Sequence, residues 1–203
     1  MLVNATLPVF KQLYHLHETN SRNFNQLPLF ILSCTGCKES ANKSTDKKLA
    51  TLKIKLPQVP KAIGSYVDAS RVGNLVFFSG KGLRQSNGEY IKGKVGTDLS
   101  IQAGYAAATL TALNQLAVLK ESRLLNRIKR IVKVNGYVNS SDSFYDQQKI
   151  MDGFSDLMLE IFGEAGRHSR TSVSASSLPM NMAIEVEMGV EVEQVISKKF
   201  TGS

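Results

Sequence analysis

The sequence predicts an α+β protein in which a single β-sheet carries two helices on one of its faces. Three observations lead to this prediction: two stretches have apolar residues at helical spacing, a β-rich stretch separates them, and a pair of strand patterns stands at each end. The order strand pair, helix, strand, helix, strand pair builds a two-layer domain. At 203 residues, with 42% apolar and 21% charged residues, the chain is long enough for one well-buried core.

Residues 1–50 mix short apolar segments with Asn, Ser, Thr and Lys and follow no period. We expect a poorly ordered N-terminal extension there, followed by a domain at 51–195 and a C-terminal tail at 196–203. A short strand is predicted at 50–56. No segment approaches the roughly 20 apolar residues of a spanning helix, so we expect no membrane partner. Organelle targeting by residues 1–50 is an open alternative, although a transit peptide is usually richer in Arg.

The two cysteines, Cys34 and Cys37, form a lone Cys-x-x-Cys. Zinc would need two more ligands at similar spacing, and the sequence offers none. We interpret the pair as reduced thiols, which predicts a cytoplasmic protein without a metal site.

The formal net charge of +8 invites a nucleic-acid interpretation. Residues 1–59 hold eight Lys and Arg against three acids, whereas residues 60–203 hold seventeen against fourteen. More than half of the basic excess therefore lies in residues 1–59. The excess of three charges in the rest is too diffuse for a phosphate-binding footprint, so we expect no nucleic-acid partner.

The first strand pair turns at Gly73-Asn74, a dipeptide typical of hairpins. The apolar run 75–78 after it predicts a central strand buried on both faces. This strand ends at Ser79-Gly80, where a glycine lets backbone N–H groups approach a ligand closely. A simple exit turn is the equal alternative.

Two helices and one strand follow. The first helix is expected at 101–120, with Asp98 or Ser100 as its N-cap. A long strand is expected at 127–139, and its basic residues are best explained as a solvated strand face. The second helix buries apolar residues between Ile150 and Phe162, among them methionines that we interpret as core fillers.

The last strand pair joins 171–178 to 184–192 through Leu178-Pro179. If these two strands pair with each other, Arg170 and Glu185 lie near one another. The sheet face away from the helices carries serine and glutamate as well as apolar residues. Such a mixed face is typical of a subunit contact, so we infer an oligomer.

Several short motifs are similar, in order and spacing, to those of one known family. They are Ala62-Ile63-Gly64-Ser65-Tyr66, Gly73-Asn74 with Ser79-Gly80, Val132-Lys133-Val134 with Phe144, and Ser169-Arg170-Thr171 leading through Leu178-Pro179 to Ile184-Glu185-Val186-Glu187. On these motifs, residues 60–193 resemble the RidA/YjgF family, also called endoribonuclease L-PSP-like and related in fold to chorismate mutase. The motifs around Gly93-Lys94 and Phe162-Gly163 resemble a branch of the family that is often left without an assigned activity.

The resemblance implies a mixed sheet and a homotrimer with three intersubunit clefts, each binding a small carboxylate. Members of the RidA type hydrolyse reactive 2-imino acids, derived from 2-aminoacrylate, to 2-oxo acids and ammonia without a cofactor. Carried over to this chain, Arg170 would clamp the substrate carboxylate and Glu185 would orient the attacking water. Tyr66, Ser79 and Gly80 would line the cleft. The resemblance thus suggests a hydrolase of the 2-iminobutanoate/2-iminopropanoate deaminase type.

The residue types alone, without reference to the family, are suited to this chemistry. Arginine binds a carboxylate bidentately, and an imine is already a good electrophile. Simpler interpretations stay open: Arg170 as an ion-pair partner, Glu187 as a solvated or intersubunit charge, and His168 as a structural residue of the loop before Arg170.

The sequence also departs from the family pattern at several positions. His168-Ser169 replaces the usual Pro-Ala, Lys81 replaces a common Gln, and an Asn of many deaminating members falls near Ser155. Two other functions therefore remain as alternatives: a non-catalytic trimer that binds a small carboxylate, and an RNA-cleaving or translation-inhibiting member.

Overall fold

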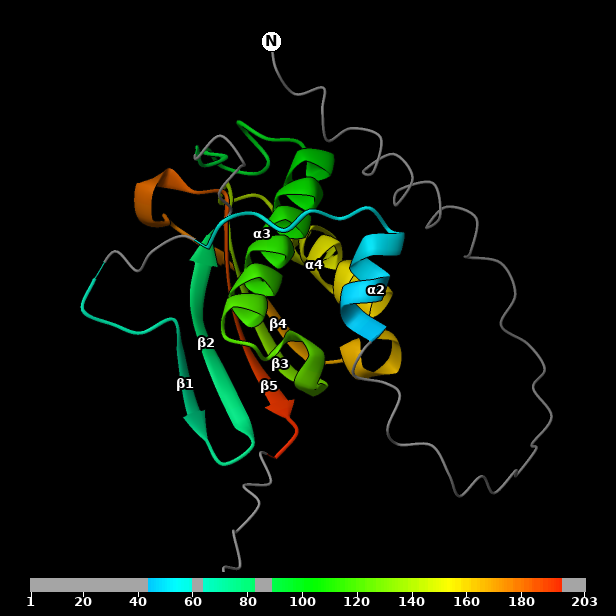
Figure 1. Cartoon of the computed structure of the whole chain (residues 1–203). Helices are drawn as coiled ribbons and strands as arrows, with labels where there is room; N and C mark the ends of the chain where they lie inside the picture. The colour runs from blue at the N-terminus through cyan, green and yellow to red at the C-terminus, as the bar shows by residue number, and fades with distance from the viewer. Residues whose placement is uncertain (1–43, 60–63, 83–88, 195–203) are drawn as a thin grey trace, which may run out of the picture. The chain divides into compact units, whose positions relative to one another are not determined.

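A five-stranded mixed sheet forms the centre of the protein in the computed structural model, which describes residues 44–59, 64–82 and 89–194 (Figure 1). The strand order is β1-β2-β5-β3-β4, with β3 and β4 parallel and all other neighbours antiparallel. The strands are β1 Ala69–Val72, β2 Leu75–Gly82, β3 Ile128–Asn139, β4 Ser169–Ala175 and β5 Ile184–Val192. The helices are α2 Ser44–Thr51, α3 Ile101–Glu121 and α4 Gln147–Phe162, with short 3-10 helices at Leu125–Arg127, Gly163–Gly166 and Pro179–Asn181.

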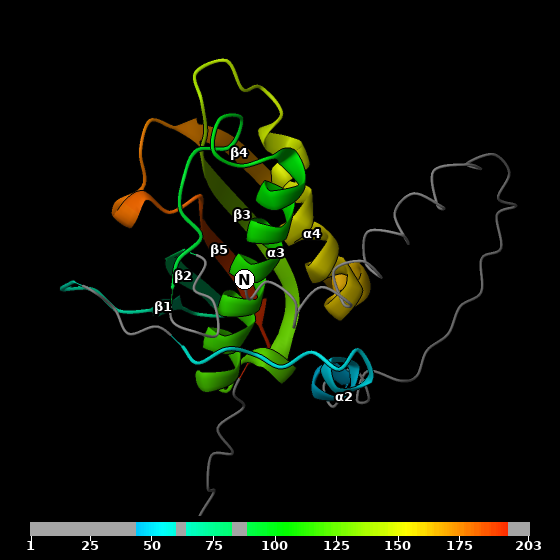
Figure 2. The same ribbon diagram turned by 90° about the horizontal axis from the view of Figure 1, so that it is seen from above.

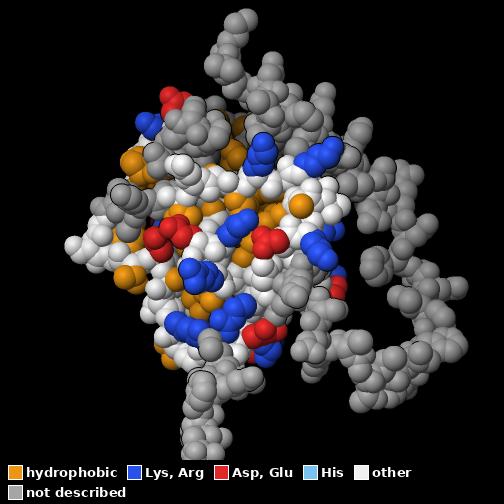
Figure 3. Space-filling view, viewed as in Figure 1, with side chains coloured by type: hydrophobic (Ala, Val, Ile, Leu, Met, Phe, Trp, Pro, Cys, Tyr) orange, Lys and Arg blue, Asp and Glu red, His pale blue; other side chains and the backbone are white. Residues whose placement is uncertain are grey.

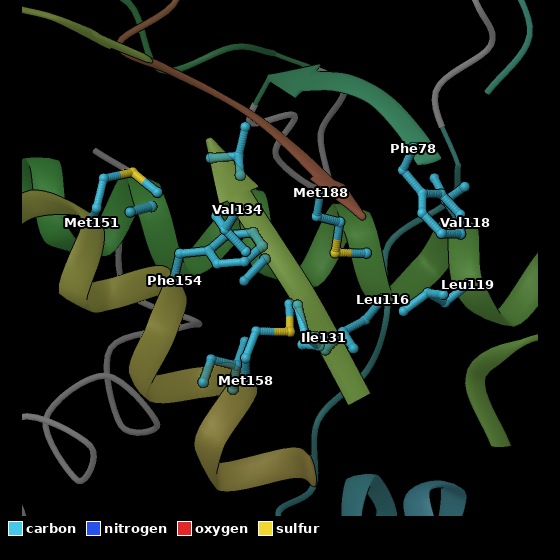
Figure 4. Close-up of a cluster of buried hydrophobic side chains, with 14 of the residues drawn as sticks. Phe78, Leu116, Val118, Leu119, Ile131, Val134, Met151, Phe154, Met158 and Met188 are labelled. Atoms are coloured by element: carbon cyan, nitrogen blue, oxygen red, sulfur yellow. The ribbon is translucent and has the colours of Figure 1, made fainter. Parts of the chain in front are cut away.

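Helices α3 and α4 lie side by side on one face of the sheet, as the sequence predicted (Figures 1 and 2). The side chain of Ser100 accepts a hydrogen bond from the Ala103 amide and caps α3. The core lies between the helices and the sheet, and it includes Phe78, Leu116, Val134, Phe154 and Met188 (Figure 4). Met151 and Met158 are fully buried there, which confirms the prediction that methionines of α4 fill the core.

The sheet alternates in the way that a one-sided core requires. In β5, Ile184, Val186 and Met188 are buried, whereas Glu185 and Glu187 are only partly buried. Within the described part of the chain, no helix packs on the second face, and the apolar side chains of Phe77 and Val173 there are 53% and 42% exposed. The mixed open face that the sequence predicted is therefore present.

The predicted pairing of the last two strands is wrong. Strand β4 pairs with β3 in parallel, and β3 separates it from β5. Helix α4 carries the chain back along the sheet between β3 and β4, so β4 starts at the same end as β3. A period-2 pattern reveals which face of a strand is apolar, but it does not reveal which strand lies beside it.

Two further predictions need correction. Strand β2 is not buried on both faces, because Val76 and Phe78 face the core while Phe77 lies on the open face. The expected strand at 50–56 does not form: α2, whose Leu49 is 4% exposed, ends at Thr51, and a turn and an irregular segment follow. Helix α2 extends across the expected boundary at residue 50. The earlier extension, Cys34 and Cys37, and the tail at 196–203 lie outside the described residues.

Helix α2 is tied to the rest of the domain by side-chain contacts. Lys48 forms an ion pair with Glu160 of α4 at 2.9 Å, and the Asp46 amide donates to Asn126 Oδ1 at 3.3 Å. None of the helices in the described ranges is long and apolar enough to cross a membrane.

Candidate functional site

A cleft of about 530 Å³ opens beside strands β2 and β5. Four of the residues predicted for the site, Tyr66, Ser79, Gly80 and Glu185, line it. The fifth, Arg170, is not among its lining residues. The other lining residues are Lys81, Gly82, Tyr90, Pro179, Met180, Met182 and Glu187.

A β-bulge shapes the floor of this cleft. Phe78 pairs with Met188 and Lys81 pairs with Val186, so two residues of β2, Ser79 and Gly80, oppose a single residue of β5. A bulge bends its strand and redirects side chains, and bulges are common beside active sites. The strand therefore does not end at Ser79-Gly80, as we expected, and the alternative of an exit turn there is replaced by a bulge within β2.

Gly80 makes room for the carboxylate of Glu185. A Cβ atom at position 80 would collide with Glu185 Oε1 and Cδ. The absence of a side chain at position 80 therefore lets the carboxylate lie across the bulge, and a larger residue would displace it.

Gln115 of α3 supports the bulge from the core side, and the sequence analysis missed it. Its side-chain amide is completely buried and donates to the Val186 carbonyl at 2.8 Å and to the Ser79 carbonyl at 3.3 Å. Buried carbonyls need such donors where the backbone hydrogen bonds between two paired strands are interrupted. The signal in the sequence was a polar residue at a position of α3 that the helical period assigns to the core.

The two glutamates of the cleft have different surroundings. Glu187 accepts hydrogen bonds from Asn135 Nδ2 at 2.8 Å and from the Tyr137 hydroxyl at 3.2 Å. Glu185 has no hydrogen bond or ion pair within the described part of the chain. Burial raises the pKa of Glu185, and the negative charge of Glu187 raises it further. Glu185 is therefore a carboxyl group that can take up and return a proton more readily than a solvated one.

The pKa of Tyr137 is raised as well, by burial first and then by the charge and the hydrogen bond of Glu187. Tyr137 thus remains a donor to Glu187. The interpretation of Glu187 as a solvated charge is replaced by this bonded arrangement within the sheet.

Lys81 does not supply a free positive charge to the cleft. It is 5% exposed and forms an ion pair with Asp68. Among the described lining residues, Lys81 is the only basic one, and Glu185 and Glu187 are both acidic. The cleft of a single chain therefore suits a neutral or cationic group better than a carboxylate.

Arg170 lies on the other face of the sheet. It is in register with Val134, a core residue of β3, whereas Glu185 is in register with Tyr137. Its guanidinium contacts α4, where Nη1 lies 2.9 Å from both Asp152 Oδ1 and Ser155 Oγ. The structure of one chain therefore does not bring Arg170 and Glu185 together.

Residues 46–192 match the family described as "YjgF/chorismate mutase-like, putative endoribonuclease". The chain belongs to this family. The match covers the whole sheet, both helices of the core and the cleft with Glu185. It starts within α2, before the 60–193 segment on which the resemblance was first noted.

Relatives of this YjgF-family chain come from distant organisms. Protein TCP17 of Trypanosoma cruzi is 38% identical over 146 residues, which are 71% of this chain and 91% of that protein. A 2-iminobutanoate/2-iminopropanoate deaminase of Dermatophagoides farinae is 28% identical over 141 residues, covering 69% of this chain and 95% of the relative. A solved structure from Shewanella oneidensis, described as a "putative endoribonuclease", is 38% identical with a TM-score of 0.69, covering 73% of this chain and 99% of that one.

The described residues of this YjgF-family chain also show whether side chains gather into a possible metal site. Nowhere in residues 44–59, 64–82 and 89–194 do three or more His, Cys, Asp or Glu side chains gather as metal ligands would. The titratable side chains that line the cleft are those of Tyr66, Lys81, Tyr90, Glu185 and Glu187.

Proposed function

We propose that this protein is a RidA-like deaminase that hydrolyses reactive 2-imino acids to 2-oxo acids and ammonia. The observation that carries the proposal is Glu185, whose carboxyl lies across Gly80 in the cleft without a bonded partner in the described chain. Burial and the charge of Glu187 raise its pKa, which suits a group that exchanges protons with water. The 28% identical deaminase relative supports the same reaction.

We further propose that the site is completed in a homotrimer by Arg170 of a neighbouring subunit. Two observations support this. The cleft holds two acidic side chains and, within the described residues, no unpaired basic one, so the carboxylate of a 2-imino acid needs a cation from elsewhere. Arg170 lies near the start of β4, an edge strand, and its side chain is 21% exposed to solvent. The exposed apolar side chains of the open face supply contact surface for the neighbour.

In the proposed reaction, the neighbour's Arg170 binds the substrate carboxylate through two N–H donors. Glu185 accepts a proton from a water molecule as the water oxygen attacks the imine carbon. The nitrogen of the adduct receives this proton from Glu185, which gives the neutral carbinolamine. A second proton then moves from the carbinolamine hydroxyl to nitrogen through Glu185 as the C–N bond breaks, so ammonia leaves and the carbonyl forms. One water is consumed for each imine, and neither a metal nor a cofactor takes part.

The test is to generate 2-iminobutyrate in situ from 2-aminobutyrate with an amino-acid oxidase and to follow its disappearance. We expect the protein to accelerate the loss, Glu185→Gln to lower kcat by about 10²-fold or more, and Arg170→Ala to raise KM. A rate equal to buffer, unchanged by either substitution, would refute the proposal.

A non-catalytic carboxylate-binding trimer is the second candidate, and Arg170 itself favours it. Its guanidinium already has a carboxylate partner, Asp152, and the usual Pro-Ala before it is His168-Ser169. This candidate predicts that 2-oxobutyrate raises the melting temperature of the protein by binding its folded state, while 2-iminobutyrate decays no faster than in buffer.

RNA cleavage, which the family description mentions, has less physical support. Figure 3 displays acidic side chains between the basic ones on the face viewed in Figure 1, and the cleft carries Glu185 and Glu187. The acidic side chains weaken the attraction of this face for phosphates, and the two glutamates of the cleft repel them. RNA cleavage in 0.2 M salt that disappears in Arg170→Ala would favour this candidate instead. A cytoplasmic location, as the cysteine usage suggests, is part of the same proposal.

A further inference from the structure

His168 and Arg170 are joined by a chain of hydrogen bonds outside the cleft. His168 Nδ1 lies 2.7 Å from the Gly166 carbonyl oxygen, and its Nε2 lies 3.0 Å from Ser155 Oγ. Ser155 Oγ in turn accepts from Arg170 Nη1 at 2.9 Å. From the sequence, His168 is expected to be a structural residue of the loop before Arg170.

The direction of every bond in this chain follows from the chemistry of its members. A carbonyl oxygen can only accept, so His168 Nδ1 carries the proton and donates to Gly166. In a neutral imidazole the other nitrogen is then an acceptor, and the Ser155 hydroxyl donates to it. The Ser155 oxygen, with its proton committed to His168, presents its lone pairs to Arg170.

The same contacts leave one edge of the Arg170 guanidinium open. Nη1 donates to Ser155 Oγ and lies 2.9 Å from Asp152 Oδ1, with which Arg170 forms an ion pair. Nη2 has a longer contact, 3.3 Å, with the Gln148 carbonyl, and Nε has no partner in the described part of the chain. Nε and Nη2 form the fork that receives a carboxylate side-on. The α4 contacts therefore hold the side chain mainly through Nη1, with a longer hydrogen bond from Nη2, and Nε keeps its N–H for a ligand.

We propose that His168 is a positioning residue, which acts through Ser155 to hold Arg170 with its Nε–Nη2 edge open to a substrate carboxylate. The inference rests on the proposed function for the identity of the substrate. It assigns a role to a residue that stands where the family usually has proline.

The surroundings of His168 keep its ring in the form that this role requires. Burial lowers the pKa of His168, the hydrogen bond to Gly166 opposes this shift, and the positive charge of Arg170 lowers the pKa further. The ring of Phe154 meets the imidazole edge-on, with centroids 6.4 Å apart. The charged groups of the cluster are Arg170 and Asp152, while Glu164 and Arg167 pair with each other at the surface. A proton on Nε2 would turn this acceptor into a donor, break the bond with the Ser155 hydroxyl and place two cations close together.

The experiment compares the wild-type protein with His168→Ala, His168→Gln and Arg167→Ala. We expect His168→Ala to raise KM for 2-iminobutyrate about tenfold, the loss of one hydrogen bond, with little change in kcat. His168→Gln places an oxygen acceptor near the position of Nε2, so it should restore KM at neutral pH. It should also remove the rise of KM that the wild type shows on acidification, because glutamine does not titrate. Arg167→Ala, an exposed neighbour, is the control and should leave both parameters unchanged.

A second measurement separates this inference from the proposed function. The Nε–Hε signal of Arg170 in a 15N-labelled sample reports whether the side chain is held, with no substrate present. We expect a distinct signal in the wild type and in His168→Gln, and a solvent-averaged one in His168→Ala. An Arg170 signal unaffected by His168→Ala overturns the positioning role, whatever the reaction. A lost signal together with no turnover by the wild type would instead refute the deaminase and leave the positioning role supported.

Discussion

Arg170 and Glu185 project from opposite faces of the same sheet, Arg170 towards α4 and Glu185 into the open-face cleft. A β-strand directs successive side chains to alternate faces, so no rotamer change brings the two groups together within one chain. Any site that uses both must therefore combine two subunits.

This relationship predicts complementation between two inactive variants. In mixed trimers of Arg170→Ala and Glu185→Gln chains, a site that takes its arginine and its glutamate from different subunits is intact in about one quarter of cases. We expect roughly that fraction of wild-type deaminase activity after joint refolding. Separately refolded variants, mixed without exchange of subunits, serve as the control. An intrachain site would give no recovery.

The contact between Gly80 and Glu185 predicts a specific intolerance. Gly80→Ala places a methyl group against the Glu185 carboxylate, so we expect a loss of at least about 1 kcal/mol of stability and most of the activity. Gly189→Ala in β5 is the matched control, since its new Cβ would be 3.5 Å from the Phe77 ring, an ordinary contact. Urea unfolding of both variants measures the difference. Equal midpoints would contradict the close packing at the bulge.

Glu185 is also predicted to cost stability at neutral pH. Because its pKa is raised in the folded state, the folded protein binds this proton more tightly than the unfolded chain. Stability therefore decreases as the pH rises from the unfolded pKa through the folded one. Glu185→Gln should raise the free energy of unfolding at pH 7, by up to about 1 kcal/mol after solvent screening, and the gain over the wild type should shrink near pH 4.

The control for this experiment is Glu193→Gln, an exposed carboxyl just after β5. We expect no change in its unfolding free energy at either pH. If Glu185→Gln were less stable than the wild type at pH 7, the ionised carboxylate would have to be stabilised in the fold, contrary to its raised pKa.

Gln115 is predicted to connect the core with the site. Gln115→Met keeps the volume but removes the donors to the Ser79 and Val186 carbonyls. Each buried carbonyl left without a donor costs about 1–3 kcal/mol, and the gain from removing the unbonded Gln115 Oε1 offsets part of this. We expect a net loss of stability together with reduced turnover. Gln102→Met, at an exposed position of α3, should change neither in thermal unfolding or in the assay.

Leu49 tests whether α2 belongs to the folded domain. The side chain is 4% exposed, so Leu49→Ala should lower the free energy of unfolding by about 2–5 kcal/mol. Lys47→Ala, on the exposed side of the same helix, should have a small effect. Denaturant unfolding monitored by circular dichroism compares the two. Similar midpoints would indicate that α2 contributes nothing to the stability of the domain.

The arrangement of elements was largely predictable from local pattern. Helical spacing identified α3 and α4, and Ser100 is one of the two caps proposed for α3. Alternation identified β5, and the Gly73-Asn74 turn joins β1 to β2 as expected, with Gly73 at φ 60°. These features depend on residues within a few positions of one another, where the periods of helix and strand act directly. The family motifs likewise led to Tyr66, Ser79, Gly80 and Glu185, which share one cleft.

Only the tertiary structure decided which distant segments of the chain are in contact. Sequence alone determined that Arg170 precedes a strand and that Glu185 lies on the polar face of another. It could not reveal that β3 separates these strands, that Gln115 bonds carbonyls 36 and 71 residues away, or that Asp152, Ser155 and His168 surround Arg170. Periodicity fixes which face of an element is apolar, but the free energy of packing the whole chain selects the element that this face meets.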